Sequence, residues 1–307
     1  MEQVVCDLCG SDRSKVRFSS TLRDGDEGDL SAYRCTHSGY GRHHTIVECL
    51  ECGLVYANPR HNNGEILSKY EAVQDPLYVK EREGRVLTFE RHLRPLEKIA
   101  PPGDGRRLLD VGCHVGVFVE IAARHGWDAW GVEPSHWAAK QAQQAGLQVI
   151  EGTLSTAGLE DASFDVITMW DVIEHVEQPS LQVREAFRLL KPGGVLAVHT
   201  MDLNSLFARL MGRRWPWLME MHVYFFTRRT LAALLEQAGL RVIEVRPQGR
   251  YLRLGYLSTR VAAFSQPLGR GVGWLFDRLR LSERAIPINL GDLVTMYARK
   301  PIESATN

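Results

Sequence analysis

Two features that the sequence lacks limit where the protein acts and what it binds. No uninterrupted apolar run approaches the length of a membrane-spanning helix, and the N-terminus Met-Glu-Gln-Val-Val has neither the basic nor the apolar block of a secretion signal. We therefore expect a cytoplasmic protein. Net charge is also absent, because 37 Lys and Arg balance 37 Asp and Glu. Without a basic field, we expect no nucleic-acid partner.

Cysteine is scarce, with six residues in 307, and four of the six form two Cys-x-x-Cys-Gly pairs. In a reducing compartment such pairs are typical of metal ligands rather than disulfides. Each pair places two thiolates on a tight turn, and the glycine that follows permits the necessary backbone twist. Together they predict a closed structural Zn²⁺ site. Its expected ligands are Cys6, Cys9, Cys49 and Cys52.

The remaining two cysteines carry weaker predictions. Cys35 lies between the pairs, beside His37 and near His43 and His44. We expect exposed polar loop residues there, with a second metal site as the alternative. Cys113 lies in a glycine-bearing turn and is expected to be a small turn residue rather than a nucleophile.

From Arg106 onward, predicted strands and helices alternate, which is typical of an α/β fold with parallel strands and right-handed crossovers. The fold class we predict is α/β, with a doubly wound, mostly parallel sheet of seven strands. The predicted strands are 107–111, 129–133, 148–150, 164–170, 194–200, 241–246 and 293–298, and the helices between them are 117–125, 135–145, 180–190 and 228–238. A long irregular segment is expected between the last two strands.

The most informative segment is the turn between the first strand of this sheet and the helix that opens at Val117. Asp110 and Gly112 begin the turn, and the next strand ends at Glu133. This arrangement predicts a nucleoside cofactor, whose ribose diol would bind the Glu133 carboxylate. The glycine spacing differs from G-x-G-x-x-G, and Asp110 would repel a pyrophosphate. Asp110 suits an ammonium group instead, which disfavours a nicotinamide-dependent oxidoreductase.

These segments resemble the class I S-adenosylmethionine (SAM)-dependent methyltransferases, with a Rossmann-like fold. Asp110, Gly112 and Gly116 match the D-x-G-x-G-x-G motif, and residues 164–176 and 189–195 resemble the fourth-strand motif and the turn into the fifth strand. The resemblance implies SAM as cofactor. The cofactor-binding residues it implies are Asp110, Gly112, Cys113, His114, Gly116, Glu133, Pro134, Thr153, Leu154, Trp170 and Asp171. For Thr153 and Leu154, a plain surface turn is the alternative.

One residue departs from the family motif. His114 stands where the family has its middle glycine. A side chain at positive φ costs roughly 1–2 kcal/mol, although His tolerates that region better than most residues. We expect the turn to adjust and the cofactor still to bind. The alternative is a zinc-stabilised binding or scaffold protein whose cofactor site has decayed.

Two histidines are candidate general bases for methyl transfer to a hydroxyl, because imidazole can accept a proton near neutral pH. His175 closes the run Asp171-Val-Ile-Glu-His175, which is similar to that of ubiquinone-pathway and antibiotic-tailoring O-methyltransferases. His222 follows an aromatic segment, Trp215-Pro-Trp217, that we expect to form a lid. The alternatives are a capping or supporting role for His175 and a core position for His222.

The domain order predicted is a zinc-ribbon-like module (1–60), a helical connector (61–104), the methyltransferase core (105–250) and a basic insert with the final strand (251–307). This order resembles bacterial enzymes of sugar, glycolipid and antibiotic pathways. The expected acceptor is a hydroxyl of a small or lipid-linked molecule, such as a sugar, glycolipid, quinol or natural product. Arginines and apolar residues intersperse residues 250–284, which predicts a solvated basic face. Peripheral contact with an anionic membrane, or a grip on a phosphate-bearing acceptor, is the alternative.

Overall fold

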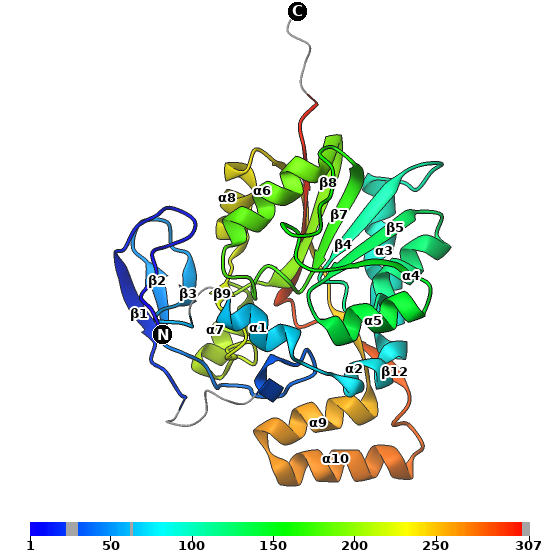
Figure 1. Ribbon diagram of the computed structural model, residues 1–307. Helices are drawn as coiled ribbons and strands as arrows, with labels where there is room; N and C mark the ends of the chain where they lie inside the picture. The colour runs from blue at the N-terminus through cyan, green and yellow to red at the C-terminus, as the bar shows by residue number, and fades with distance from the viewer. Residues whose placement is uncertain (23–29, 62–63, 303–307) are drawn as a thin grey trace, which may run out of the picture.

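The computed structural model describes residues 1–22, 30–61 and 64–302, so the last five residues of the predicted segment 251–307 lie outside it. Its main sheet has seven strands in the order β10-β13-β8-β7-β4-β5-β6 (Figure 1). Only β13 runs antiparallel to its neighbours within this sheet. The strands are β4 (Arg107–Val111), β5 (Asp128–Glu133), β6 (Gln148–Glu151), β7 (Phe164–Trp170), β8 (Leu190–Met201), β10 (Arg241–Pro247) and β13 (Leu293–Arg299). The predicted α/β class, with a mostly parallel sheet of seven strands, is confirmed.

Helices cover both faces of the sheet. Successive residues of a strand point to opposite faces, so Leu108 packs with one layer and Leu109 with the other. Both residues are fully buried, as expected for strands of a sheet covered on two sides. The first layer contains α3 (Arg82–Ile99), α4 (Val117–Arg124) and α5 (His136–Gln144), and the second contains α6 (Pro179–Leu189) and α8 (Arg228–Gln237).

The N-terminal part forms a second, four-stranded antiparallel sheet, at the left of Figure 1. Its own strands are β1 (Ser14–Phe18), β2 (Ile46–Cys49) and β3 (Val55–Ala57), and its fourth strand, β9 (Tyr224–Phe225), comes from the second half of the chain. A short 3₁₀ helix, η2 (Leu30–Tyr33), lies between β1 and β2. The apolar core of this sheet continues into the α6 and α8 layer. The two sheets therefore share one core.

The connector forms three helices, α1 (Glu65–Glu71), α2 (Pro76–Lys80) and α3. Between β8 and α8 lie α7 (Leu206–Met211), the 3₁₀ helix η3 (Gly212–Arg214) and β9. Strand β8 begins four residues before the predicted start, and it pairs with β7 across a register shift. None of the described helices combines the length and the apolar character needed to cross a bilayer.

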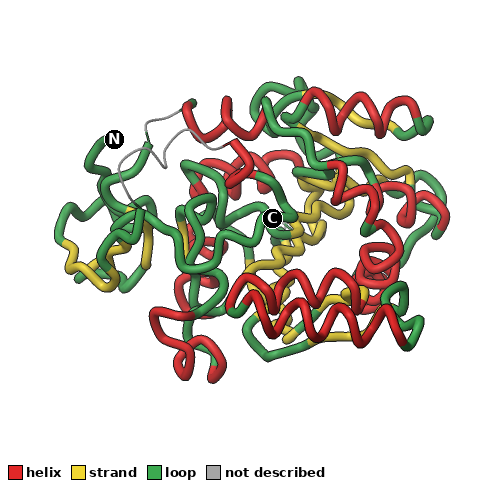
Figure 2. The backbone as a smooth tube through the Cα atoms, turned by 90° about the horizontal axis from the view of Figure 1, so that it is seen from below, coloured by secondary structure: helices red, strands yellow, loops and turns green. Residues whose placement is uncertain are grey.

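The prediction of a long irregular segment between β10 and β13 is wrong. The segment contains a β-hairpin, β11 (Arg250–Arg253) with β12 (Ala285–Ile288), which encloses the helices α9 (Leu254–Phe264) and α10 (Gln266–Arg278). Figure 2, seen from below, shows α9 and α10 side by side. A Cβ at Gly269 would collide with Ala262, so this glycine lets the two helices touch. The three glycines of α10 lower its helix propensity, which hid the helix from sequence analysis.

The expectation of exposed histidines near Cys35 is also wrong for His43 and His44. Both are buried, at 2% and 3% exposure. The Nδ1–H of His43 donates to the carbonyl of His44 at 2.7 Å, and burial lowers the pKa of both rings. They precede β2, where the His43 ring packs against Phe18 and the His44 ring against His61. Only His37 of this group is half-exposed.

Candidate active site

A cavity of about 500 Å³ lies at the carboxyl ends of the central strands. Ligand pockets typically have volumes of about 300–1,000 Å³, so this cavity is large enough for a small molecule. Its turn end is formed by Gly112, His114, Pro134, Thr153 and Leu154, and its histidine end by Glu174, His175, Trp217, Met221 and His222. Residues of the N-terminal part, the connector and the hairpin complete the wall. The predicted residues Trp170 and Asp171 also line it, whereas Asp110, Cys113, Gly116 and Glu133 lie behind the wall.

The glycine turn has the positive φ values that its sequence predicts, at 66° for Gly112 and 76° for Gly116. A Cβ at Gly112 would lie 2.8 Å from Val172, so the turn packs directly on the segment after β7. Gly116 begins α4 and packs against Leu147. The side chain of Cys113 is buried against Gly131, which agrees with a small turn residue.

His114 adopts φ 51°, the left-handed conformation expected at the place of a glycine. Its ring stacks on Tyr78 at 3.7 Å between centroids, and Arg85 covers the other side of Tyr78 at 3.3 Å. Its main-chain N–H donates to Glu133 Oε2 at 2.8 Å. The turn therefore accommodates the side chain, because a main-chain group makes the hydrogen bond that fixes Glu133. The ring Nδ1 is buried and has no partner among the described residues, so it is available to a ligand in the cavity.

Glu133 is fully buried at the end of β5. Burial raises the pKa of its carboxyl to about 7, although the N–H groups of Ser135 and His114 and the Tyr70 hydroxyl stabilise the charged form. The Ser135 N–H donates to Oε1 at 2.8 Å, so with the Tyr70 hydroxyl the two oxygens together accept three hydrogen bonds. A carboxylate has about four acceptor positions, so one position remains for a hydroxyl of a ribose diol. This chemistry fits the nucleoside of SAM.

Asp110 is buried behind the turn and accepts a hydrogen bond from Thr168 Oγ1 at 2.7 Å. Burial raises the pKa of this carboxyl to about 8, and the nearby Glu133 adds to the effect. A cationic group close by would favour the charged form. Without such a group Asp110 is mostly protonated at neutral pH, and its binding of an ammonium group stays a prediction.

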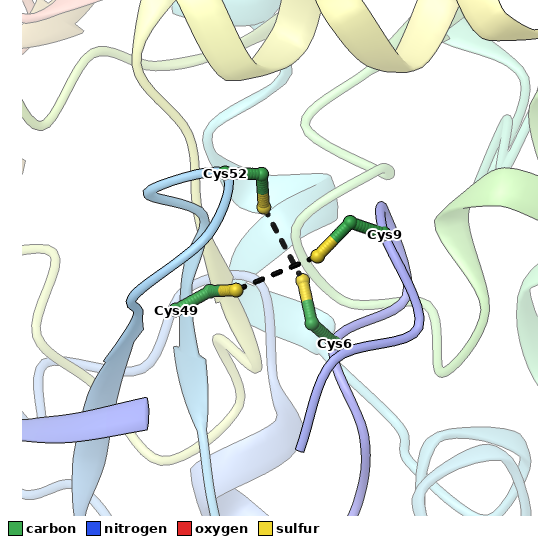
Figure 3. A group of neighbouring side chains, drawn as sticks. All are labelled: Cys6, Cys9, Cys49 and Cys52. Atoms are coloured by element: carbon green, nitrogen blue, oxygen red, sulfur yellow. Dashed lines mark hydrogen bonds between the residues drawn. The ribbon is translucent and has the colours of Figure 1, made fainter. Parts of the chain in front are cut away.

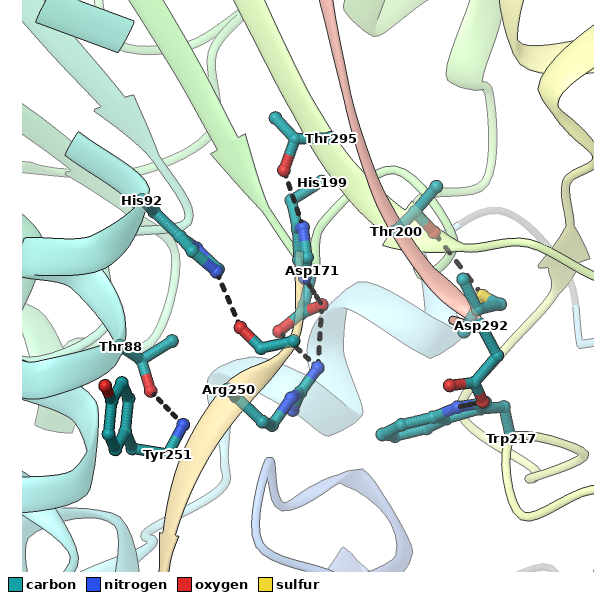
Figure 4. A network of polar contacts seen from close by, with 12 residues as sticks. Thr88, His92, Asp171, His199, Thr200, Trp217, Arg250, Tyr251, Asp292 and Thr295 are labelled. Atoms are coloured by element: carbon teal, nitrogen blue, oxygen red, sulfur yellow. Dashed lines mark hydrogen bonds and ion pairs between the residues drawn. The ribbon is translucent and has the colours of Figure 1, made fainter. Parts of the chain in front are cut away.

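A polar network joins the core to the hairpin (Figure 4). Two of its histidines, His92 and His199, pack against Trp170. Arg250 Nη2, from β11, lies 3.2 Å and 3.1 Å from the two carboxylate oxygens of Asp171. Burial alone would raise the pKa of Asp171, but Arg250, with His199 and His92, lowers it to about 2. Both contacts come from the same nitrogen, and this ion pair holds Asp171, whose φ is 55°, in the wall.

Segments of the hairpin also bind the connector in this network. His92 Nε2 donates to the carbonyl of Gly249 at 3.1 Å, and the Tyr251 N–H donates to Thr88 Oγ1 at 2.8 Å. The arginines of the insert thus divide into two groups. Arg250, Arg253 and Arg260 bind Asp171, Glu81 and the carbonyls of Thr36 and His37, whereas Arg270, Arg278, Arg280 and Arg284 are exposed.

The two predicted bases, His175 and His222, lie side by side at the histidine end, with ring centroids 4.7 Å apart. Each Nδ1 donates to a main-chain carbonyl, His175 to Met221 at 2.9 Å and His222 to Trp217 at 2.7 Å. This leaves the Nε2 of each ring as its lone-pair atom. Glu174, which the sequence did not single out, lies beside both rings.

The predicted aromatic lid is instead a fixed wall. Trp215 is fully buried, and its indole N–H donates to Asp292 Oδ2 at 3.0 Å. Trp217 lines the cavity and donates to the same oxygen at 2.8 Å. Two hydrogen bonds to one buried carboxylate hold this segment against β13.

The four cysteines of the two predicted pairs converge (Figure 3). Sγ atoms of Cys6 and Cys52 lie 3.4 Å apart, and those of Cys9 and Cys49 lie 3.5 Å apart. The glycines that follow the pairs have φ of 73° and 76°, as the tight turns require. Asp7 binds the start of α6 through Ser180, so the cluster is attached to the core.

The turn, the acid at the end of β5 and the order of the strands define a class I SAM-dependent methyltransferase. A family model described as a methyltransferase domain matches residues 80–245, which is 166 of the 307 residues. The chain therefore belongs to this methyltransferase family, and the oxidoreductase and scaffold alternatives are not favoured.

Two similar proteins share one description. Ubiquinone biosynthesis O-methyltransferases of Paracidovorax citrulli and Methylococcus capsulatus are 34% and 36% identical over 38% and 35% of this chain. The chain spans 57% and 48% of these relatives, about half their length. A SAM-dependent methyltransferase structure from Thermotoga maritima is 25% identical, with a TM-score of 0.47 over 71% of this chain and 90% of that one.

Proposed function

We propose that the protein transfers the methyl group of SAM to a hydroxyl oxygen of a small or lipid-linked acceptor, with a quinol, a sugar, a glycolipid and a natural product as the candidates. SAM supplies an electrophilic methyl group on a sulfonium. At the turn end, Glu133 would hold the ribose, Asp110 the ammonium group, and Thr153 and Leu154 the adenine. Trp170 and Asp171 would line the methionine end.

The observation that carries this proposal is the pair His175 and His222, facing the same cavity as the cofactor turn. Both rings are neutral, since burial lowers the pKa of each. An acceptor hydroxyl placed against the two Nε2 atoms would lose its proton there as the methyl group is transferred. The surrounding wall of Trp217, Met219 and Met221 would pack an apolar ring and exclude water.

The test begins with calorimetric titration of SAM, followed by a methyl-transfer screen over catechols, quinols, sugar nucleotides and glycolipids. We expect one SAM per chain and transfer to a hydroxyl. Failure of millimolar SAM to bind would overturn the cofactor assignment. Methylation of an amine or a carbon atom, with no hydroxyl acceptor found, would overturn the choice of oxygen.

We further propose that the four cysteines hold a structural Zn²⁺. Tetrahedral thiolates around Zn²⁺ at about 2.3 Å would lie about 3.8 Å apart, close to the sulfur separations in the cluster. Elemental analysis of the purified chain should find one zinc, and Cys49→Ser should lose it and unfold the N-terminal sheet at a lower temperature. Cys35→Ser, outside the pairs, is the matched control. Full zinc content in Cys49→Ser would contradict the assignment.

A lipid-linked acceptor is supported by the outer face of α10. Leu268, Trp274 and Leu275 of α10 and Leu279 just after it are exposed, and the four exposed arginines lie within residues 270–284. Such a face suits the surface of an anionic bilayer. The protein should sediment with phosphatidylglycerol vesicles at low salt, and Trp274→Ala with Leu275→Ala should weaken this several-fold. Equal binding to phosphatidylcholine vesicles, or no binding, would contradict a role for anionic lipid.

A further inference from the structure

Three arginines from separate segments of the chain line the cavity. Arg85 belongs to α3, Arg250 begins β11 and Arg260 lies in α9. Burial, and after it the positive charges of Arg250 and Arg85, lower the pKa of the Arg260 guanidinium. The three charges therefore act on one another across the cavity. Like charges brought together away from water destabilise a fold unless an anion binds between them.

The acids of the cavity wall do not neutralise these arginines. Asp171 pairs with Arg250, and Glu81 is already bound by another arginine of the insert, with nitrogen–oxygen distances of 2.7 Å and 3.0 Å. No carboxylate in the part of the chain that the structure describes forms an ion pair with Arg85 or Arg260. Two positive charges thus remain without a counter-ion.

Two further acids line the cavity, Glu174 and Glu177. Burial raises the pKa of both carboxyl groups, and the pKa of Glu174 reaches about 8. Glu174 is therefore mostly protonated at neutral pH and cannot balance an arginine there. Glu177 accepts a hydrogen bond from the main-chain N–H of Gly64 at 2.8 Å.

Arg260 is held in place and still has donors to offer. Its Nη1 and Nη2 donate to the carbonyls of His37 and Thr36 at 2.6 Å and 2.7 Å, and its guanidinium carbon lies 4.3 Å from the centre of the Tyr256 ring. A guanidinium has five N–H groups, so N–H groups remain after these two hydrogen bonds. A guanidinium fixed in this way is preorganised to bind an oxyanion.

The other two arginines have donors without an acceptor. The Nε atoms of Arg85 and Arg250 are buried and have no hydrogen-bond partner among the described residues. Native proteins satisfy almost all such atoms, so these two indicate a ligand that accepts hydrogen bonds. Each guanidinium also lies over an aromatic ring, at 3.3 Å from the centre of Tyr78 and 5.1 Å from the centre of Trp217. Stacking of this kind leaves the N–H edge available to a carboxylate or a phosphate.

We propose that Arg85, Arg250 and Arg260 bind an oxyanion of the acceptor, either a carboxylate or a phosphate. This oxyanion site rests on the proposed function, because it selects among the candidate acceptors those that carry an anionic group. Arg250 lies over Trp217 of the histidine end, so the oxyanion would lie beside the part of the acceptor whose hydroxyl meets the imidazoles. A neutral acceptor would leave the arginines without a counter-ion and should bind more weakly.

The test uses the full chain saturated with S-adenosylhomocysteine, so that binding is measured without methyl transfer. The probes form two pairs that differ in charge: 3,4-dihydroxybenzoate with its methyl ester, and glucose 6-phosphate with glucose. Calorimetry should show that the anionic member of at least one pair binds about tenfold or more tightly than its neutral partner, because charge-assisted hydrogen bonds are the stronger ones. The two pairs distinguish a carboxylate from a phosphate.

Variants then locate the oxyanion. Arg85→Gln and Arg260→Gln should each reduce the preference for the anionic probe about fivefold or more, whereas Arg260→Lys keeps the charge and should reduce it less. The matched control is Arg270→Gln, which changes an exposed arginine of the same insert and should leave the preference unchanged. The melting temperature of each variant shows whether lost binding reflects unfolding.

Each outcome decides the inference. No binding, or equal binding of charged and neutral members in both pairs, would overturn it, as would a preference that survives in folded Arg85→Gln and Arg260→Gln. SAM has a carboxylate of its own, so a loss of SAM affinity with an unchanged probe preference would assign the arginines to the cofactor and also overturn it. If only neutral acceptors are methylated on a hydroxyl, the oxyanion site fails while the proposed function stands. If the anionic probes bind but no hydroxyl is methylated, the proposed function fails instead.

Discussion

The turn end of the cavity comes from one stretch of chain between Gly112 and Leu154, whereas the histidine end comes from segments far apart in sequence. Glu174 and His175 follow β7, and Trp217 to His222 precede β9. The turn end depends on main-chain geometry, with Gly112, His114 and Gly116 of the turn at positive φ. The histidine end depends on side chains fixed by hydrogen bonds to main-chain carbonyls, one distant in sequence (Met221) and one local (Trp217). We therefore expect changes at the turn end to affect cofactor affinity and changes at the histidine end to affect turnover.

The largest effect should come from the histidine end. His175→Ala should lower kcat about 10²- to 10⁴-fold, because a group that acts on the acceptor oxygen is lost. The dissociation constant of SAM should change less than threefold. Steady-state kinetics with the acceptor found by the screen, and calorimetry with SAM, measure the two quantities. The exposed His136→Ala is the control, and a kcat within threefold of wild type would remove His175 from the reaction.

At the turn end, Glu133→Gln should weaken SAM binding by about 10- to 100-fold, since charge-assisted hydrogen bonds contribute about 1.5–3 kcal/mol. At saturating SAM, kcat should stay within a few-fold of wild type. Glu151→Gln, the exposed acid at the end of the adjacent strand β6, is the matched control. If Glu133→Gln bound SAM normally and lost kcat, the division of labour between the two ends would be wrong.

A smaller effect on SAM affinity is expected at His114, the residue that departs from the family motif. His114→Gly should change SAM affinity by less than tenfold, because the main-chain N–H that binds Glu133 is kept. His114→Ala separates the contribution of the ring stack from that of backbone strain. Alanine removes the stack on Tyr78 but keeps a Cβ at positive φ. Calorimetry would measure both. Loss of all SAM binding in His114→Gly would show that the ring itself is required.

The smallest effect concerns stability and pH. The pKa of Asp110 is raised from 3.8 to about 8 in the folded protein, so the folded state holds a proton that the unfolded state has released. Its contribution to stability is present below about pH 4 and is lost as the pH rises toward 8. Urea unfolding without cofactor measures the free energy of unfolding at pH 6 and at pH 9. The decrease in this free energy from pH 6 to pH 9 should be smaller in Asp110→Asn than in wild type. An equal loss in both would contradict the raised pKa.

The turn end could be predicted because its determinants are consecutive in sequence. The strand, the glycines and Glu133 all occur between residues 107 and 133, and the left-handed conformation of His114 follows from the motif. The positions of the strands and the burial of the core also follow from the spacing of apolar residues. His175 and His222 were found through a local motif and an aromatic neighbour.

The remaining parts of the site depend on long-range packing that has no local signal. Arg250 and Arg278 look alike in sequence, yet one binds Asp171 and the other is exposed, because β11 pairs with β12 beside the connector. Tyr78 and Arg85 lie in the connector without a motif, and they enter the site only because α2 and α3 pack over the turn. Trp215 was expected in a lid because sequence cannot show that Asp292 holds it.

Strand β9 has a consequence for how this enzyme can be divided. Its two residues, Tyr224 and Phe225, lie in the N-terminal sheet and follow His222 by two positions. A chain shortened to residues 80–245, the region that the family model matches, would leave β9 with no strand to pair with and its buried aromatic rings uncovered. We expect such a fragment to aggregate, since an unpaired apolar edge recruits other chains. A catalytic core that is transferred to another protein would therefore have to include the N-terminal sheet.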